Sequence, residues 1–419
     1  MYRIIPAGFL SLAASLVVPS LLSAQDWPEF RGPAGQGLAE GSNFPLQWSA
    51  TRNVAWKHSV PGSGWSSPVV KDGHIYLTTS VSTSDGHLSL RALCLKESNG
   101  ETEWTKEIFS IQPGEAVRIH TKNSQASATP LIVENRIYVH FGHLGTACLN
   151  QDGSLAWKND SLHYPPVHGN GGSPVLVDDV LIFSCDGASK PFVIGLDAGT
   201  GKERWRTPRV TTSKKTFSFS TPTVIAVKGS KQVISPGSGV VCAFEPKTGR
   251  EMWRVRYGEG YSVVPRPVYS PRHNLVFLSS GFDRPSVLAI RPGGSGDVTD
   301  THVIWQLTKG APNTPSPLLV GDELYLVSDG GIASCVDAAS GKVHWQERVG
   351  GNHSASPIHG DGKIYFQNEE GTCVVVKAAR QFEKLSENAL GERALASFAA
   401  GAKALYIRTA ESLYKISEQ

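Results

Sequence analysis

The chain has 419 residues and carries 40 Lys and Arg against 37 Asp and Glu, which gives a formal net charge of +3 at pH 7. So small a net charge does not favour nucleic acid or an anionic membrane as a partner, and we expect neither. The length suits two or three ordinary domains, or one large closed all-β domain.

Residues 1–24, MYRIIPAGFLSLAASLVVPSLLSA, have the layout of a secretory signal peptide. Arg3 precedes an apolar run, and the small residues that end at Ala24 suit cleavage after that residue. An uncleaved membrane anchor is the alternative, but Pro6 and Pro19 interrupt a run already near the roughly 18-residue minimum for a span. No Cys follows the run to support a lipid anchor. We therefore expect an exported protein, periplasmic or secreted, whose mature chain has no transmembrane segment.

Residues 25–50 include DWPEFRGPAGQG at 26–37, which is rich in Gly and Pro. The stretch has too few apolar residues to form a domain of its own. We predict an extension that packs across the domain that follows, with Trp27 and Phe30 docked against one of its sheets.

A ten-residue motif recurs within residues 51–419: LDAGTGKERW at 196–205, FEPKTGREMW at 244–253 and VDAASGKVHW at 336–345. Seven tryptophans fall on the last position of this unit, at spacings of 40 to 53 residues. They are Trp56, Trp104, Trp157, Trp205, Trp253, Trp305 and Trp345. Leu385 stands where the next should be, which gives eight units. A period of about 40–50 residues made of short strands is typical of a β-propeller.

Each unit repeats one order of elements. A Ser/Thr-Pro step opens an apolar strand, a turn leads into an alternating strand such as VGDELYLVS, and a third strand and a Gly turn precede the Trp strand. Pro suits a strand start because it cannot donate a ladder hydrogen bond, and Gly suits the turns because it accepts positive φ. One four-stranded unit cannot bury both faces, so we predict that the units stack around an axis with the indole rings between them.

The two ends of the repeat region complement each other. The last unit stops after its third strand, whereas NVAWK at 53–57 is a Trp strand with nothing before it. The sequence therefore predicts an all-β fold, a single eight-bladed β-propeller of four-stranded blades in which the N-terminal strand closes the last blade. Seven blades are the alternative if residues 389–416 pack otherwise.

These units resemble the repeat of the quinoprotein family, the PQQ-like eight-bladed propellers, and the likeness covers nearly everything after residue 50. The opening DWPEFRGPAGQG and the stretch SGWSSP resemble a secreted bacterial subfamily of PQQ-binding-like repeat proteins. Two branches share the fold: PQQ-dependent, calcium-using dehydrogenases, and BamB-type propellers, which are non-enzymatic scaffolds. The chain departs from the first in its shorter length and in lacking a vicinal Cys-Cys pair, and from the second in lacking a lipidation Cys.

The six cysteines suggest buried hydrophobic positions more than disulfides. Cys94, Cys148 and Cys335 share one register of the repeat, and Cys242 and Cys373 lie one or two residues earlier in it. Equivalent positions in different blades are too far apart for a disulfide bond. There is no CxxC and no Cys/His spacing suited to zinc, so we predict no metal site. Only Cys185 lies elsewhere in the repeat, and its reactivity stays open.

The loops that lead into the innermost strands and those that leave the second strands open on one face of a propeller. Their polar residues are the candidate ligand-binding set of a central funnel. This set comprises His168, Asn170, Asp186, Arg266, Asp283, Asp329, Asn352, His353 and Glu369. The stretch HGNGG at 168–172 is the strongest candidate because permissive glycines let backbone amides approach a ligand. The alternative is that these residues line a channel only to meet water.

The combined observations favour a non-catalytic scaffold over an enzyme. We expect an exported monomer that binds a protein or a polysaccharide of the cell envelope, resembles BamB, and needs no cofactor. The alternative is a PQQ- and calcium-dependent periplasmic dehydrogenase acting on alcohols or sugars, with an Asp as general base. Its calcium would need converging oxygen ligands, which Asp186, Asp283, Asp329 and Glu369 are the residues to supply.

Overall fold

A computed structural model describes residues 26–41, 43–401 and 403–418. The signal peptide expected at residues 1–24 lies outside these residues. Within them, no helix combines the length and the apolar character needed to cross a membrane.

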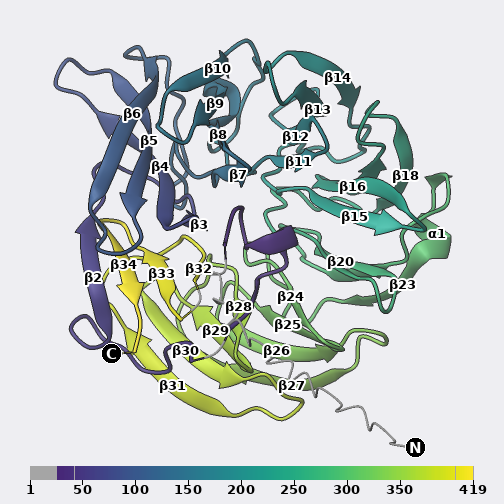
Figure 1. Ribbon diagram of the computed structural model, residues 1–419. Coiled ribbons are helices and arrows are strands. Elements are labelled where there is room, and N and C mark those ends of the chain that lie inside the picture. The colour runs from purple at the N-terminus through teal and green to yellow at the C-terminus, as the bar shows by residue number, and fades with distance from the viewer. Residues whose placement is uncertain (1–25, 42, 402, 419) are drawn as a thin grey trace, which may run out of the picture.

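Eight antiparallel sheets follow one another around a central axis, as Figure 1 shows. Blades 1 to 4 are made of β3 (Val69–Lys71), β4 (His74–Ser82), β5 (Leu88–Lys96) and β6 (Thr102–Ile111); β7 (Leu131–Val133), β8 (Arg136–His140), β9 (Thr146–Asn150) and β10 (Leu155–Asn159); β11 (Val175–Val177), β12 (Val180–Cys185), β13 (Phe192–Asp197) and β14 (Glu203–Pro208); and β15 (Thr223–Val227), β16 (Ser230–Gly237), β17 (Val240–Phe244) and β18 (Glu251–Arg256).

Blades 5 to 8 are made of β19 (Val268–Ser270), β20 (Leu275–Ser279), β21 (Val287–Ile290) and β23 (Val303–Leu307); β24 (Leu318–Val320), β25 (Glu323–Val327), β26 (Ile332–Asp337) and β27 (Val343–Arg348); β28 (Ile358–Gly360), β29 (Lys363–Gln367), β30 (Thr372–Lys377) and β31 (Lys384–Ala389); and β32 (Ala399–Ala400), β33 (Leu405–Arg408), β34 (Ser412–Ile416) and β2 (Val54–Ser59). The predicted all-β, eight-bladed fold is confirmed. The seven-bladed alternative is wrong, because β32 to β34 form a blade of their own.

The N-terminal strand closes the ring, as predicted. β2 pairs antiparallel with β34, with Val54 opposite Ile416 and Ser59 opposite Ser412. The purple β2 and the yellow β34 lie side by side in Figure 1. This pairing covers the edge that the last blade would otherwise leave open.

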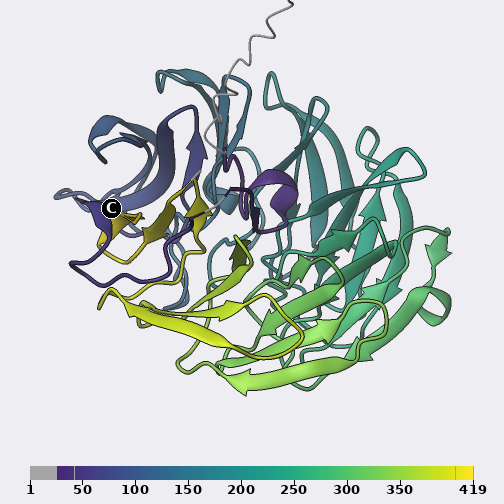
Figure 2. The ribbon, with the colours of Figure 1, turned by 60° about the horizontal axis from the view of Figure 1, so that its bottom comes forward.

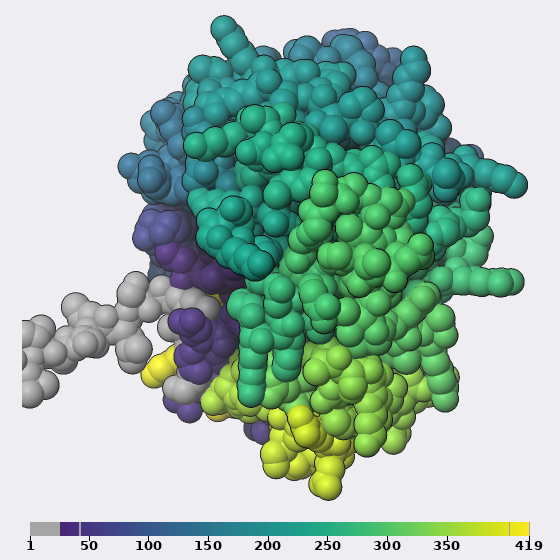
Figure 3. Space-filling view, turned by 90° about the vertical axis from the view of Figure 1, so that its right-hand side faces the viewer, coloured from purple at the N-terminus to yellow at the C-terminus, as the bar shows by residue number. Residues whose placement is uncertain are grey.

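A few short elements decorate the blades. β1 (Leu38–Ala39) adds to the inner edge of blade 7 by pairing parallel with β28, and β22 (Gly296–Asp297) adds to the outer edge of blade 4 by pairing parallel with β18. The helical turns are η1 (Pro33–Gly35), η2 (Gly142–Leu144) and α1 (Thr299–His302). Figure 3 views the outer rim, where the teal, green and yellow-green blades lie in contact and purple residues emerge at one end of the axis.

Six of the seven repeat tryptophans connect their blade to the next through the indole N–H. The acceptors are backbone carbonyls at 2.9 to 3.1 Å, in the pairs Trp56–Glu97, Trp104–Gln151, Trp157–Ala198, Trp205–Pro246, Trp305–Ala338 and Trp345–Ala379. In five of these six pairs the turn glycine of the next blade lies against the ring, and at Gly201 a Cβ would collide with Trp157; Trp345 contacts Phe382 instead. Gly is needed there for this contact as well as for its φ of 71°.

Trp253 differs from the other six. It donates to the side-chain oxygen of Gln232 in its own blade at 2.9 Å. Blade 5 replaces the usual turn by the segment that contains β22 and α1, and β22 pairs with the Trp253 strand instead. All six cysteines are buried and free, which confirms their interpretation as hydrophobic core positions.

The segment after residue 25 crosses the ring axis, where the purple trace lies in Figures 1 and 2. Its hydrogen bonds reach inner strands on opposite sides of the ring; three pairs are between backbone groups, and in the Gln36–Tyr269 pair the Tyr269 N–H donates to the Gln36 side-chain oxygen. The pairs are Trp27 with Val70 of β3, Pro28 with Ile132 of β7, Gln36 with Tyr269 of β19, and Gly37 with His359 of β28. Trp27 is fully buried, and Phe30 is half-buried. We call residues 26–39 the axial segment.

Candidate functional site

A cavity of about 340 Å³ lies at the end of the ring axis where the inner strands begin. Its wall combines hydroxyl, aromatic and basic side chains from the loops that lead into those strands, and Phe30 of the axial segment completes it. We call this cavity the funnel. It is within the size range of small-ligand sites, or of a site for one projecting part of a larger partner.

A ring of small hydroxyl residues surrounds the axis at the Ser/Thr-Pro steps. Each backbone N–H donates to the hydroxyl at the equivalent position of the next blade, at 2.9 to 3.0 Å, in two runs: Ser67 to Thr129 to Ser173 to Thr221, and Arg266 to Ser316 to Ser356 to Ser397. The motif therefore has a second role beyond starting a strand, because it links neighbouring blades. Most of these hydroxyl residues also line the funnel.

Arg266 replaces the hydroxyl residue in blade 5, and its side chain turns to the axial segment. The guanidinium donates to the Phe30 carbonyl at 2.5 Å, to the Glu29 carboxylate at 2.7 Å and to the Pro222 carbonyl at 3.2 Å. Its side chain is 2% exposed. A Cβ at Gly35 would collide with this guanidinium, so only Gly fits there. Arg266 does not line the funnel; it holds the axial segment in place.

An arc of rings occupies one side of the funnel. His120, His168, Phe217 and Tyr261 follow one another edge to face, with successive centroids 5.5, 5.4 and 5.5 Å apart. Such edge-to-face pairs are favourable beyond the area they bury. The Lys215 ammonium lies 3.9 Å from the centre of the Tyr261 ring. Burial, followed by the neighbouring His120, lowers the pKa of His168.

The basic residues of the funnel mouth include Lys122, which donates to Glu369 at 2.7 Å. Beside it, the Arg393 guanidinium donates to the Thr121 carbonyl at 3.1 Å and lies 5.6 Å from the centre of the Trp65 ring. Burial alone would raise the pKa of Glu369, but Lys122 and the Ser354 hydroxyl outweigh it and hold that pKa below its ordinary value. Glu369 therefore positions two residues of the funnel wall without facing the cavity.

The other three predicted carboxylates have partners of their own. Asp329 accepts from the backbone N–H groups of Asn313 and Thr314 and from the Thr314 hydroxyl at 2.7 Å. Asp283 accepts from the Tyr261 hydroxyl at 2.8 Å. The four carboxylates thus serve four separate contacts, and they do not form a shared set of ligands.

Asp186 lies deepest of the four. It forms an ion pair at 3.0 Å with Arg209, and both side chains are fully buried. Burial raises the pKa of Asp186 to about 6, and the Arg209 charge opposes that rise. The calcium set predicted from Asp186, Asp283, Asp329 and Glu369 is not one that these positions fit.

The remaining predicted residues divide in two. His168 lines the funnel, and its positive φ of 64°, followed by 94° at Gly169, gives the turn that the HGNGG stretch predicted. Asn170 only donates weakly to the Gly172 carbonyl at 3.4 Å. Asn352 and His353 lie beside the funnel wall, where Asn352 accepts from the Glu369 amide and buried His353 contacts the Gly350 carbonyl at 2.9 Å.

Sequence reasoning missed the aromatic wall, which consists of Phe30, Trp65, Phe217, Phe219, Tyr261 and Phe282. One signal was present, since the alternating FSFSTP at 217–222 places two Phe residues immediately before a Ser/Thr-Pro step. Alternation puts both rings on one face of the extended chain. We interpret such rings as wall residues because the step itself surrounds the axis.

Solved structures share this architecture at low identity. BamB from Moraxella catarrhalis has 13% identity and a TM-score of 0.56, with 86% of this chain and 98% of that chain covered. The quinohemoprotein alcohol dehydrogenase ADHIIG from Pseudomonas putida HK5 has 11% identity and a TM-score of 0.64, with 94% and 81% covered. The computationally designed Ika8 protein has 9% identity and a TM-score of 0.60, with 87% and 99% covered. These likenesses establish the fold alone.

No curated protein matches the chain. A family profile does match it, over residues 46–184, 189–269 and 294–387, and the family is described as outer membrane protein assembly factor BamB. The matched ranges contain all or part of every blade, apart from most of the blade that closes the ring. This agrees with the resemblance carried by the Trp repeat. The chain is a PQQ-like eight-bladed propeller and belongs to the family of the outer membrane protein assembly factor BamB.

Proposed function

We propose that this protein is a non-catalytic scaffold, exported to the periplasm or beyond, that binds a protein of the cell envelope at its funnel. The proposal rests on one observation, namely that the residues forming the funnel wall and the nearby carboxylates have different roles. Aromatic rings and hydroxyls form its wall, whereas each nearby carboxylate is engaged in a separate structural contact. Such a wall provides binding surface, and none of these four carboxylates is free to act as a general base.

The chemistry of the wall suits a projecting apolar or aromatic side chain flanked by a carboxylate. The arc from His120 to Tyr261 offers ring faces and edges, while Lys122 and Lys215 bring positive charge close to it. Aromatic residues and buried apolar anchors carry most of the binding free energy of protein interfaces. The family description, an outer membrane protein assembly factor, also favours a protein partner. A polysaccharide is the second ligand class that stacked rings and hydroxyls would accept.

Site-directed photocrosslinking tests the proposal. A photoreactive residue placed at Tyr261 should give a discrete crosslinked product with envelope extract, and the same group at exposed Leu155 on an outer strand should not. The Tyr261 product should weaken when Lys122 is replaced by Ala. Peptides of a second protein in the purified product identify a protein partner, and a product whose size a glycosidase reduces identifies a polysaccharide. Equal yields at both positions, or no product at Tyr261, would refute the proposal.

The dehydrogenase alternative finds less support in the funnel. Its calcium ligands would be Asp186, Asp283, Asp329 and Glu369, and each of these is committed to a different partner. Adding PQQ and Ca²⁺ to the purified protein gives a direct comparison. A shift of the quinone absorbance together with dye-linked oxidation of an alcohol or sugar would replace the scaffold proposal by an enzymatic one.

A further inference from the structure

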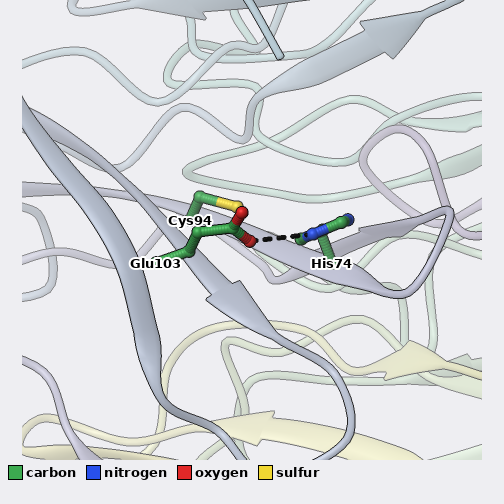
Figure 4. A group of neighbouring side chains, drawn as sticks. All are labelled: His74, Cys94 and Glu103. Atoms are coloured by element: carbon green, nitrogen blue, oxygen red, sulfur yellow. Dashed lines mark ion pairs between the residues drawn. The ribbon is translucent and has the colours of Figure 1, made fainter. Parts of the chain in front are cut away.

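Blade 1 brings three metal-binding side chains together on adjacent strands, away from the funnel. His74 of β4, Cys94 of β5 and Glu103 of β6 place one donor atom each within 4.8 Å of one another. Figure 4 shows the Cys94 sulfur beside the Glu103 carboxylate, with the His74 ring facing them. Among residues 26–41, 43–401 and 403–418, this is the one such group of His, Cys, Asp or Glu.

The orientation of the His74 ring is fixed from behind. Its Nδ1 lies 2.9 Å from the Asp72 carbonyl oxygen, which can only accept, so Nδ1 carries the proton. In the neutral imidazole, Nε2 then presents a lone pair to the Glu103 oxygen at 2.8 Å, which is also an acceptor. The Nε2 atom and the carboxylate oxygen thus face each other, as two ligands of one ion would. An Nδ1–H to carbonyl contact is also the usual outer support of a metal-binding imidazole.

Other blades show that the repeat does not impose this cluster. Cys94 lies opposite Tyr76 and Trp104, and Cys335 of blade 6 lies opposite Tyr325 and Trp345 in the same way. Blade 6 even has the same residue types at matching positions, with Glu323 and His344 exchanged relative to blade 1. There, Arg380 binds Glu323 at 2.7 Å, and the three donors do not converge. In blade 2, Arg136 and Ala156 stand at the matching positions, so Cys148 has no such neighbours.

We propose that His74, Cys94 and Glu103 form a zinc-class site that joins the three outer strands of blade 1. One imidazole nitrogen, one sulfur and one carboxylate oxygen are the mixed ligand set that Zn²⁺ accepts, and a fourth position stays open to water. The Glu103 side chain is 42% exposed and His74 35% exposed, so an ion can enter from solvent. Donors around a tetrahedral zinc lie roughly 3–4 Å apart, so only small side-chain adjustments are needed.

Cobalt(II) titration of the untagged mature chain under reducing conditions tests this site. We expect a thiolate-to-cobalt charge-transfer band that saturates at one equivalent and that Zn²⁺ then removes. Cys94→Ala should abolish the band, while the matched variants Cys148→Ala and Cys335→Ala should retain it. Circular dichroism establishes that each variant keeps its strands.

Glu103→Gln is the second variant, because it changes a half-exposed side chain and leaves the core intact. It should weaken Co²⁺ binding by more than the roughly 10–100-fold that loss of an outer-shell partner costs. The proposal is overturned if the wild-type protein gives no thiolate band, if the band survives Cys94→Ala, or if Glu103→Gln binds Co²⁺ as tightly as the wild type.

Discussion

The indole ring of Trp48 stacks on the phenol ring of Tyr365, with centroids 6.3 Å apart and planes inclined by 26°. Tyr365 belongs to blade 7, whose outer strand carries Leu385 where other blades carry Trp. The equivalent tyrosines lie 6.0 to 6.3 Å from the Trp of their own blade, in the pairs Tyr76–Trp104, Tyr138–Trp157, Tyr325–Trp345 and Tyr406–Trp56. Trp48 thus supplies, from before the first blade, the ring that blade 7 lacks.

Replacing Trp48 by Ala should therefore weaken the packing of blade 7 and lower the free energy of unfolding. The side chain is 4% exposed, and truncating a buried Trp costs about 3–5 kcal/mol of unfolding free energy. Trp48→Phe should retain most of the stability, because the indole N–H has no hydrogen-bond partner to lose. The measurement is the midpoint of thermal unfolding, with Leu155→Ala on an exposed strand as the control. An unchanged midpoint for Trp48→Ala would show that the ring contributes nothing.

The contact between Glu29 and Arg266 gives a second prediction. Glu29→Gln leaves a buried guanidinium without its carboxylate, and breaking such a pair costs on the order of 3–5 kcal/mol when both partners are fully buried. Glu29 is 18% exposed, so we expect a smaller loss. The axial segment should then become more sensitive to limited proteolysis than in the control Glu40→Gln, which changes an exposed residue. Equal cleavage rates would show that other contacts suffice to hold the segment.

The sequence predicted the architecture because one residue pattern recurs from blade to blade. Trp spacing sets the number of blades, and the missing last strand together with the unmatched Trp56 predicts the closure. Where one unit departs from this pattern, the residues of that unit do not show what compensates for the difference. Nothing near Leu385 in the sequence shows that Trp48 replaces the absent ring, because Trp48 precedes the first blade and Tyr365 belongs to the seventh.

The funnel was predicted in position but not in composition. Loop position told us which end of the axis His168 and Glu369 would share, but it carries no information on side-chain partners. Arg266 pairs with Glu29, and Asp186 pairs with Arg209, because burial demands a counter-charge that only the folded chain identifies. The sequence also does not reveal the cluster of His74, Cys94 and Glu103, because strand pairing and not a fixed sequence interval brings these residues together.

Stability should fall with acid at moderately low pH. Burial, followed by the nearby His143, lowers the pKa of His140 to about 3, and burial, followed by His163, lowers that of His143 to about 4. In the unfolded chain both rings titrate near pH 6.5, so between about pH 6.5 and 4 the unfolded state binds more protons than the folded state. The contribution of these two rings to the unfolding free energy is therefore constant above about pH 7 and falls as the pH decreases, by up to about 1.4 kcal/mol per pH unit for each ring.

The check is the unfolding free energy between about pH 7 and 5, a window that lies above most carboxylate titrations. His140→Gln should reduce the slope, because it removes one ring whose protonation accompanies unfolding in this window. A slope that His140→Gln leaves intact would assign the acid sensitivity to other groups.

Phe217 is the central ring of the funnel arc, in contact with His168, Phe219 and Tyr261, and it provides the sharpest test of the binding site. The ring lines the cavity and is only half-buried, so Phe217→Ala should remove binding surface with little effect on the blades. We expect partner affinity to fall by about 10–100-fold, the range of a single aromatic anchor worth about 1.5–3 kcal/mol.

Phe382→Ala is the matched control, because it truncates an equally half-buried ring on the outer side of blade 7, against Trp345. The measurement is the concentration dependence of the crosslink from the Tyr261 position. If both variants bind alike, Phe217 is not an anchor for the partner.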